Sequence, residues 1–240
     1  MNSERRTRLL ARLLDGNTEL STKRLCEVCA EVVGMNGAGI MLMAGDIPQG
    51  SLCTTDDVSA LIEESQFALG EGPCVDAHRL DRAVLEPDLA NPSTPRWQAF
   101  TGPALDAGVR AIFGFPLRMG GVRLGALNLY RDKPGALTDE QHADALGMAD
   151  IATRAVLVMQ SNAPFGQIAA ELTSGAHFEY VVHQASGMVA AQLDVSVGQA
   201  LIRLRGYAFG NTRSLREVAE DVVARRLRFD GASGEQDPTP

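Results

Sequence analysis

The stretch VRAIFGFPLRMGGVRLGALNLYRD (109–132) decides the fold class. Both of its halves are rich in β-branched, aromatic and other large apolar residues, which favour strands. Gly120 and Gly121 between them suit a tight turn. The sequence therefore predicts an antiparallel hairpin with strands at 109–117 and 122–132. This hairpin indicates a mixed α/β region and not a purely helical one.

Helix and strand signals alternate in the residues before this hairpin. A helix is predicted over 21–33, capped by Ser21 or Thr22 and stopped by Gly34. A Pro/Gly turn at 46–50 separates two strand signals. The other elements predicted in this region are strands at 38–45, 51–55 and 83–89 and helices at 56–66 and 96–108.

The character of the chain changes after the hairpin. Residues 138–160 predict one long helix, with Thr138 as its N-cap and Gln141 at the matching capping-box position. The apolar stripe of this helix continues to Met159, further than the closing helix of a domain requires. The extended stripe favours a seam between two copies of the chain.

No strand signal follows residue 167, and three helices are predicted there. The first spans about 176–192. The second begins at the capping box of Ser196 and ends at Gly210, and the third begins at the capping box of Ser214. The predicted organisation is therefore an N-terminal helical segment (1–20), an α/β domain that includes the long helix (21–160), an all-α three-helix module (161–229) and a disordered polar tail (230–240).

Length and composition restrict the class of protein. At 240 residues the chain can form one large domain or two smaller ones. No run of about 18 apolar residues exists, so no membrane-spanning helix is predicted. The basic start of the chain is unlike a signal peptide, because Arg12 interrupts its short apolar stretch. We therefore expect a cytoplasmic protein with no membrane partner.

The four cysteines lie in the first third of the chain and are expected to be thiols in a reducing compartment. Cys26 and Cys29 form a C-x-x-C motif, which is found in redox pairs and in half of a zinc site. The motif lies on a helical pattern, however, and no second C-x-x-C occurs. Buried thiols that act as small apolar side chains are the preferred interpretation.

The segment RLRGYAFGNTRSLREVA (203–219) is basic within an acidic chain. Residues 203–229 contain seven arginines and three acidic residues, a net charge of +4, whereas the whole chain carries −8. Guanidinium groups bind phosphates and stack on bases, and Tyr207 and Phe209 offer aromatic faces for stacking. Tyr207 also lies on an apolar stripe, so its ring fits the core equally well. The candidate RNA-binding residues of this junction are Arg205, Tyr207, Asn211, Arg213 and Arg216.

Three segments of the module resemble the ANTAR family, the RNA-binding helical domain of bacterial transcription antiterminators. They are QASGM (184–188), ALIRLRGYA (200–208) and NTRSLREVAEDVV (211–223), at the order and spacing of that family. The family commonly has a lysine where this chain has Ser186. The resemblance implies a module that binds a structured, two-loop RNA hairpin in nascent transcripts.

Most of residues 20–160 resembles a GAF domain of the kind found before ANTAR modules in actinobacterial proteins. The segments that carry the likeness are LGEGPCVDA (69–77), RW (96–97), DAGVRAIFGFPL (106–117) and GALNLY (125–130). The resemblance implies an α/β (α+β) domain with a central antiparallel sheet, flanking helices and a small-molecule pocket on one face. Because GAF pockets are diverse, the fold does not name the ligand.

Cys74 and His78 in GEGPCVDAH (70–78) are the candidates for a redox or ligand-pocket site. A thiol with a lowered pKa would make Cys74 a nucleophile or a redox sensor, and a buried structural thiol is the alternative. His78 and His142 each stand alone, so no haem or metal site is predicted. Phosphate-binding loops, H-E-x-x-H helices and nucleophile elbows are absent from the sequence. We expect no catalytic residues, no cofactor and no enzymatic activity.

The sequence thus predicts a homodimeric antitermination regulator in which a GAF sensory domain controls an RNA-binding ANTAR module. Two other interpretations stay open. One is a GAF-type thiol-dependent redox enzyme or sensor that uses Cys74, with the helical module as a dimerisation tail. The other is a module that docks onto a protein instead of RNA.

Overall fold

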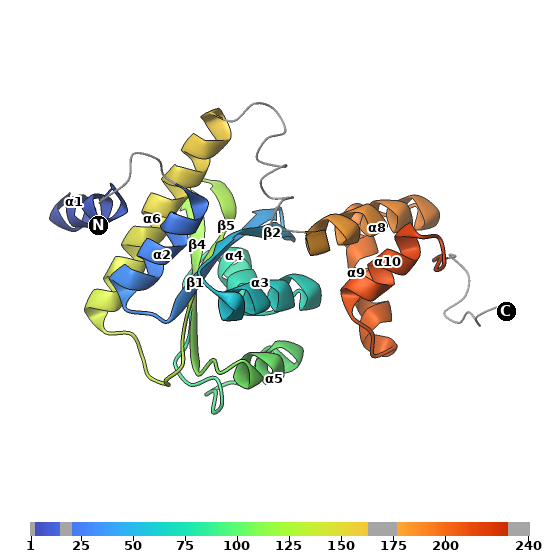
Figure 1. The fold of residues 1–240 in the computed structure, drawn as a ribbon, viewed down its shortest axis with the longest axis horizontal. Coiled ribbons are helices and arrows are strands. Elements are labelled where there is room, and N and C mark those ends of the chain that lie inside the picture. The colour runs from blue at the N-terminus through green and yellow to red at the C-terminus, as the bar shows by residue number, and fades with distance from the viewer. Residues whose placement is uncertain (1–2, 15–20, 163–176, 230–240) are drawn as a thin grey trace. The chain divides into compact units, whose positions relative to one another are not determined.

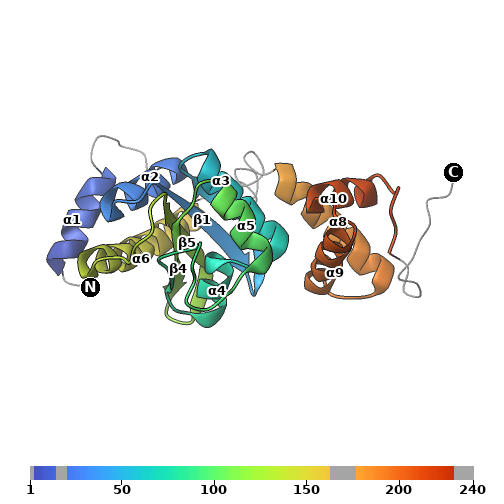
Figure 2. The same ribbon diagram turned by 90° about the horizontal axis from the view of Figure 1, so that it is seen from below.

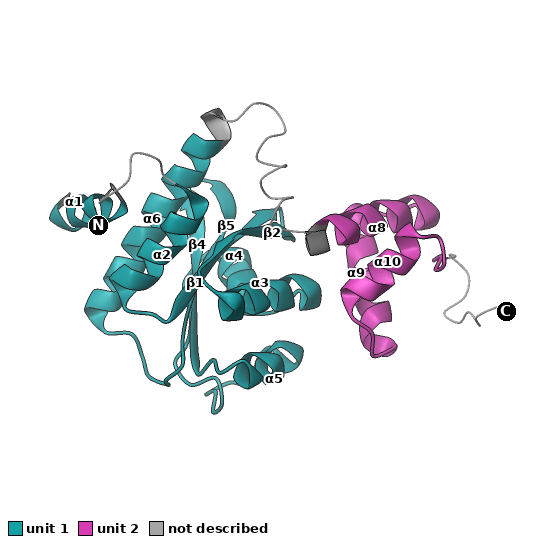
Figure 3. Cartoon of the chain, in the orientation of Figure 1, with its two compact units in different colours: residues 1–172 teal, residues 173–240 magenta. Residues whose placement is uncertain are grey.

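The computed structural model describes residues 3–14, 21–162 and 177–229. The chain divides into two compact units, residues 1–172 and 173–240 (Figures 1 and 3). Among the residues described, no helix is both long enough and apolar enough to cross a bilayer.

A five-stranded antiparallel sheet forms the centre of the first unit, with the strand order β2-β1-β5-β4-β3. The hairpin predicted from the sequence is confirmed as β4 (Ala111–Met119) and β5 (Val122–Arg131), joined at Gly120 and Gly121. The other strands are β1 (Gly37–Ala44), β2 (Ile47–Thr54) and β3 (Val84–Glu86).

Helices cover both faces of this sheet (Figure 2). Along β4, Phe113 and Phe115 point to one face and Ile112 to the other, as the alternation of side chains in a strand requires. The two faces bury separate apolar clusters. The first face carries α1 (Ser3–Leu14), α2 (Thr22–Val33) and α6 (Asp139–Asn162), and the second carries α3 (Asp57–Leu69), α4 (Pro73–Leu80) and α5 (Gln98–Asp106).

The helix boundaries predicted from capping residues are confirmed. Ser21 caps α2 by accepting a hydrogen bond from the Arg24 amide, and Gly34 ends the helix in the left-handed conformation with φ of 69°. At the start of α6, the Thr138 hydroxyl accepts from the Gln141 amide and the Gln141 side chain accepts from the Thr138 amide. Each cap satisfies backbone groups that have no partner inside the helix.

Two local predictions were wrong. The predicted turn at 46–50 is mostly strand, because β2 begins at Ile47 and only Gly45 and Asp46 make the turn. Pro48 is tolerated there because β2 is an edge strand whose pairing with β1 shifts register twice. Helix α4 was not predicted, since it is short and starts with Pro73 in place of a side-chain cap.

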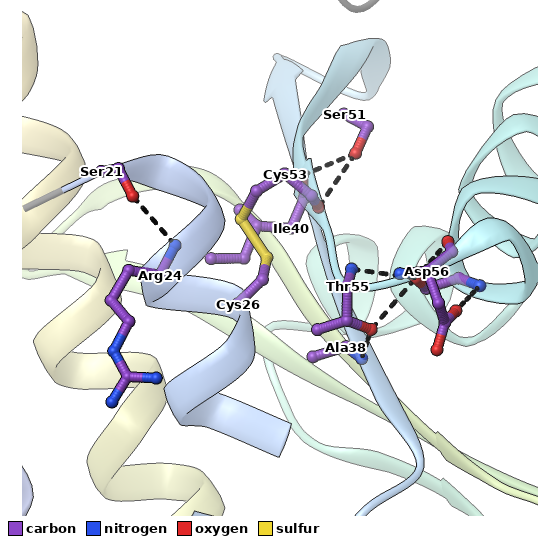
Figure 4. Close-up of a disulfide and its surroundings, with 10 residues drawn as sticks. Ser21, Arg24, Cys26, Ala38, Ile40, Ser51, Cys53, Thr55 and Asp56 are labelled. Atoms are coloured by element: carbon purple, nitrogen blue, oxygen red, sulfur yellow. Dashed lines mark hydrogen bonds between the residues drawn. A yellow bond between two sulfur atoms is a disulfide. The ribbon is translucent and has the colours of Figure 1, made fainter. Parts of the chain in front are cut away.

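A disulfide joins Cys26 of α2 to Cys53 of β2 (Figure 4). The expectation that all four cysteines are thiols is therefore wrong for these two. The two Cα atoms lie 6.1 Å apart because α2 packs on β2, across a sequence separation of 27 residues. Cys29 is a free buried thiol, and burial raises its pKa to about 12. Cys26 and Cys29 of the C-x-x-C motif are not bonded to each other, and only Cys29 keeps the predicted character of a buried thiol.

The second unit is a bundle of three helices. They are α8 (His177–Leu193), α9 (Val197–Gly210) and α10 (Leu215–Val223). Both predicted capping boxes are present, at Ser196 and at Ser214, with Gln199 and Glu217 as the reciprocal partners. The side chains that form the core of the bundle are Val182, Ala185, Val189, Ala200, Leu201, Leu204, Ala208, Leu215, Val218, Ala219 and Val222.

Candidate nucleic-acid interface and sensor core

The junction between α9 and α10 is a tight turn built by hydrogen bonds to the end of α9. Asn211 caps α9, and its side-chain amide donates to the Tyr207 carbonyl at 2.8 Å. The Arg213 amide donates to the Ala208 carbonyl at 2.9 Å, and Thr212 between them has φ of 53°. Asn211 is exposed but its amide group is used within the turn. Its first role is therefore to close the helix.

Arg213 and Arg216, two of the predicted RNA contacts, form ion pairs with acidic residues of the module itself. Arg213 forms a 2.6 Å ion pair with one carboxylate oxygen of Asp221, and Arg226 holds the other oxygen at 2.7 Å. These hydrogen bonds lower the pKa of Asp221. Arg216 forms an exposed ion pair with Glu220 one turn later on α10, at 2.9 Å. Arg213 therefore stabilises the junction, whereas Arg216 remains accessible.

Arg205 and Tyr207 are less exposed than contact residues would be. Arg205 lies at the edge of the buried face of α9, between Leu201 and Ala208, and burial lowers its pKa to about 10. Arg205, a candidate RNA contact from the sequence, is therefore only partly accessible. The half-buried Tyr207 ring packs edge-on against Phe229, with the ring centroids 5.4 Å apart. Its ring packs against the module's own C-terminal segment.

Other side chains of the module are free to meet a partner. Within residues 177–229, Arg203, Arg225 and Arg228 are exposed and form no ion pair. Phe209 is 77% exposed and Ile202 is 65% exposed. The net charge of the sequence identifies this basic segment, but it does not show which arginines are free. Arg213 is paired because Asp221, eight residues later, folds back next to it.

The ion pairs of Asp221 predict how the module responds to acid. A carboxyl whose pKa is lowered by folding stabilises the fold above its unfolded pKa of about 3.9, and this contribution is lost as the pH falls through the folded pKa. Arg213→Ala should raise the pKa of Asp221 and reduce the loss of stability below about pH 4. Side-chain NMR titration and urea unfolding of the second unit measure both effects. Arg216→Ala is the control, and an equal change in that variant would contradict the assignment.

In the first unit, Cys74 and His78 both lie on α4 but face different partners. Cys74 is fully buried, and its amide donates to the Gln66 side-chain carbonyl at 2.8 Å. Burial, and then the nearby Glu63, raise the pKa of the Cys74 thiol well above its usual value. Because a nucleophilic or redox-sensing thiol needs a lowered pKa and access, Cys74 has the character of a structural thiol.

The surroundings of His78 and the lining of a cavity in this unit give no support for a joint site with Cys74. The His78 ring is buried, and its Nε2 lies 2.7 Å from the Gly45 carbonyl in the turn between β1 and β2. A cavity of about 410 Å³ lies on the other face of the sheet, between α1, α2 and α6. Its polar lining comes from Arg8, Arg12, Glu31, Thr138, Glu140, Gln141 and Asp144, and neither Cys74 nor His78 contributes to it.

A group of buried polar side chains lies under α3 and α4, and sequence reasoning did not find it. Glu63 and Gln66 of α3 and Asn128 of β5 are each at most 2% exposed. Gly39 of β1 makes room for the Glu63 carboxylate, since a Cβ at this position would overlap it. Gly39 is also the register partner of Asn128, so these polar groups share one face of the sheet. Gly39 is the feature of the sequence that could have indicated this group. Its role becomes clear only when the register between β1 and β5 is known.

The comparisons with known proteins agree with both resemblances. A family model described as a GAF domain matches residues 22–157, which is more than half of the chain, and a model described as an ANTAR domain matches residues 177–223. No curated protein matches the chain.

Solved structures resemble the first unit at low sequence identity. The GAF domain of a phosphoenolpyruvate-protein phosphotransferase from Coxiella burnetii is 12% identical with a TM-score of 0.47, covering 67% of this chain and 98% of that chain. The corresponding Acinetobacter domain is 11% identical with a TM-score of 0.47, covering 68% and 99%. A type II free methionine-R-sulfoxide reductase from Thermoplasma acidophilum is 21% identical with a TM-score of 0.43, covering 57% and 89%. With the two family matches, the chain belongs to the GAF domain family and carries a C-terminal ANTAR domain.

Proposed function

We propose that the protein is a transcription antitermination regulator in which the GAF domain senses a small molecule or a redox signal and the ANTAR module binds structured RNA. One observation carries this proposal. The ANTAR model matches residues 177–223, and the segment 203–229, which begins inside this match and runs six residues past it, has a net charge of +4 in a chain of −8. Within this segment Arg203, Arg225 and Arg228 are exposed and form no ion pair. Free guanidinium groups are what a phosphate backbone requires.

The mechanism is a shift between two RNA structures. A nascent transcript can form either a terminator stem or an alternative two-loop hairpin structure. A protein that binds only the second arrangement shifts the equilibrium by its differential affinity for the two. Such a regulator acts in the cytoplasm, where transcripts are made.

We propose a homodimer as the acting form. Most of the apolar stripe of α6 is used in the core of its own unit, but Leu146 and Val158 remain 48% and 57% exposed on that helix. Two copies joined there would bring two ANTAR modules to two RNA loops. The second loop is then bound at a high effective concentration, which strengthens binding without any new contact.

The alternative of a thiol-dependent enzyme gains no support from the site. Cys74 is fully buried and its pKa is raised, so the thiolate needed for attack is disfavoured.

A salt titration of RNA binding tests the function. The probe is a pool of two-stem-loop RNAs with randomised loops, bound to the full chain. Replacing Arg203, Arg225 and Arg228 by alanine should weaken binding and reduce the slope of log K against log salt by about 2–3, since each lost phosphate contact removes about 0.7–0.9. Arg213 is left unchanged because it holds Asp221.

The control removes the same charge from the other unit, by replacing the exposed Arg6, Arg12 and Arg82 with alanine. An equal loss in the control would assign binding to overall charge instead of the module. Absence of binding to any RNA of the pool at low salt would rule out the proposed function.

A further inference from the structure

Helix α9 turns an apolar face to solvent. Ile202, Gly206 and Phe209 follow one another at spacings of four and three residues and so share one side of the helix. The opposite side holds the buried Ala200, Leu201, Leu204 and Ala208. Single exposed apolar residues are common, but a Phe that is 77% exposed beside an Ile that is 65% exposed is a surface that a partner is expected to cover.

Gly206 leaves open space between the two large side chains. Apart from its two chain neighbours and the backbone of its own helix, a Cβ built at this position would meet no atom within 4 Å. The helix backbone is therefore bare between Ile202 and Phe209, and a flat group can approach it closely. The exposed face therefore has the aromatic ring of Phe209 at one end, the aliphatic side chain of Ile202 at the other and the bare backbone of Gly206 between them.

The charges on α9 decide between an RNA and a second copy as the occupant. The helix contains Arg203 and Arg205 and no acidic residue. In a symmetric contact between two copies through this face, both helices bring arginines and neither offers an acidic partner from α9, so like charges gather, which is unfavourable. A polyanion is attracted by the same two charges. The face therefore suits a nucleic acid whose bases reach the apolar residues.

We infer that Phe209 stacks on an unpaired base of the bound RNA, with Ile202 and Gly206 forming the rest of the base-binding surface. Unpaired loop bases are the parts of RNA that proteins read, and aromatic side chains are their usual stacking platforms. Arg203 beside this face would hold the adjoining phosphate. The inference rests on the proposed function. Within that function, Phe209 is the residue that distinguishes an open loop from a paired stem, because only an unpaired base can stack on it.

Three substitutions of Phe209 test the stacking in the full chain. The RNA is one selected from the randomised-loop pool, with 2-aminopurine placed at each loop position in turn. Phe209→Tyr keeps the aromatic face and should bind within a factor of about 3 of the unchanged chain. Phe209→Ala and Phe209→Leu should each weaken binding by roughly 5- to 150-fold, the range of one base–aromatic stack, and should abolish the fluorescence quenching at one loop position. The salt slope should not change, because no charge is removed.

Tyr180→Leu is the matched control, since it removes another exposed aromatic ring, 55% exposed on α8. It should leave affinity and quenching unchanged. A Phe209→Leu chain that binds RNA as well as the unchanged chain overturns the stacking and leaves the RNA-binding function standing. A loss of self-association in Phe209→Ala, with RNA affinity retained, assigns the face to a second copy and also overturns it. If the unchanged chain binds no RNA of the pool, the function and the inference both fail.

Discussion

Reduction of the disulfide between Cys26 and Cys53 is expected to lower the free energy of unfolding of the GAF domain by about 3–4 kcal/mol. The bond links α2 to the edge strand β2 across 27 residues. In the chain-entropy description, cross-linking a loop of this length removes that much conformational freedom from the unfolded chain. Since the contribution comes from the unfolded state, the folded domain should keep its secondary structure after reduction.

Urea unfolding with and without a phosphine reductant measures this difference. A variant with serine at both positions 26 and 53 should show the lower stability without reductant and should not respond to it. Alkylation gives an independent count. The native protein should react little, because Cys29 and Cys74 are buried with raised pKa values. After denaturation without reductant two cysteines should be alkylated, and with reductant four. Four alkylated cysteines without reductant would show that the bond is absent.

The disulfide could not be predicted from the sequence, whereas features that depend on neighbouring residues could. The hairpin at 109–132 and the caps at Ser21, Thr138, Ser196 and Ser214 were predictable because each signal involves residues close together in the chain. Pairing of Cys26 with Cys53 depends on how α2 crosses the sheet, which only the packed fold determines.

The same limit applies to the candidate nucleic-acid interface. The net charge of 203–229 is a property of the sequence, and it marks this segment of the module as basic. Whether one arginine is available depends on its neighbours in space. Arg213 is occupied by Asp221, and Arg205 lies at the boundary of the buried face. The sequence shows that Phe209 has an aromatic face, but the exposure of its ring follows from which side of α9 packs inward.

Trp97→Ala is expected to cost about 3–5 kcal/mol of stability in the GAF domain. The ring is 6% exposed, and its Nε1–H donates to Asp76 of α4 at 2.8 Å. It packs edge-on against Phe100 of α5, with centroids 6.3 Å apart, and the Arg96 guanidinium lies 4.5 Å above it. Truncation of a buried aromatic ring removes its contacts and leaves a cavity, which accounts for the size of the effect.

Trp97→Phe separates packing from hydrogen bonding, because it keeps an aromatic ring and loses the bond to Asp76. Its expected cost is smaller, about 1–2 kcal/mol. Because Trp97 is the one tryptophan of the chain, unfolding is followed by far-UV circular dichroism in urea and not by tryptophan fluorescence. Gln98→Ala at the next, exposed position is the control and should change stability by less than about 0.5 kcal/mol. If Trp97→Ala costs no more than Gln98→Ala, then Trp97 does not anchor α5 to α4, and the R-W pair of the sequence has no structural role in closing this face of the sheet.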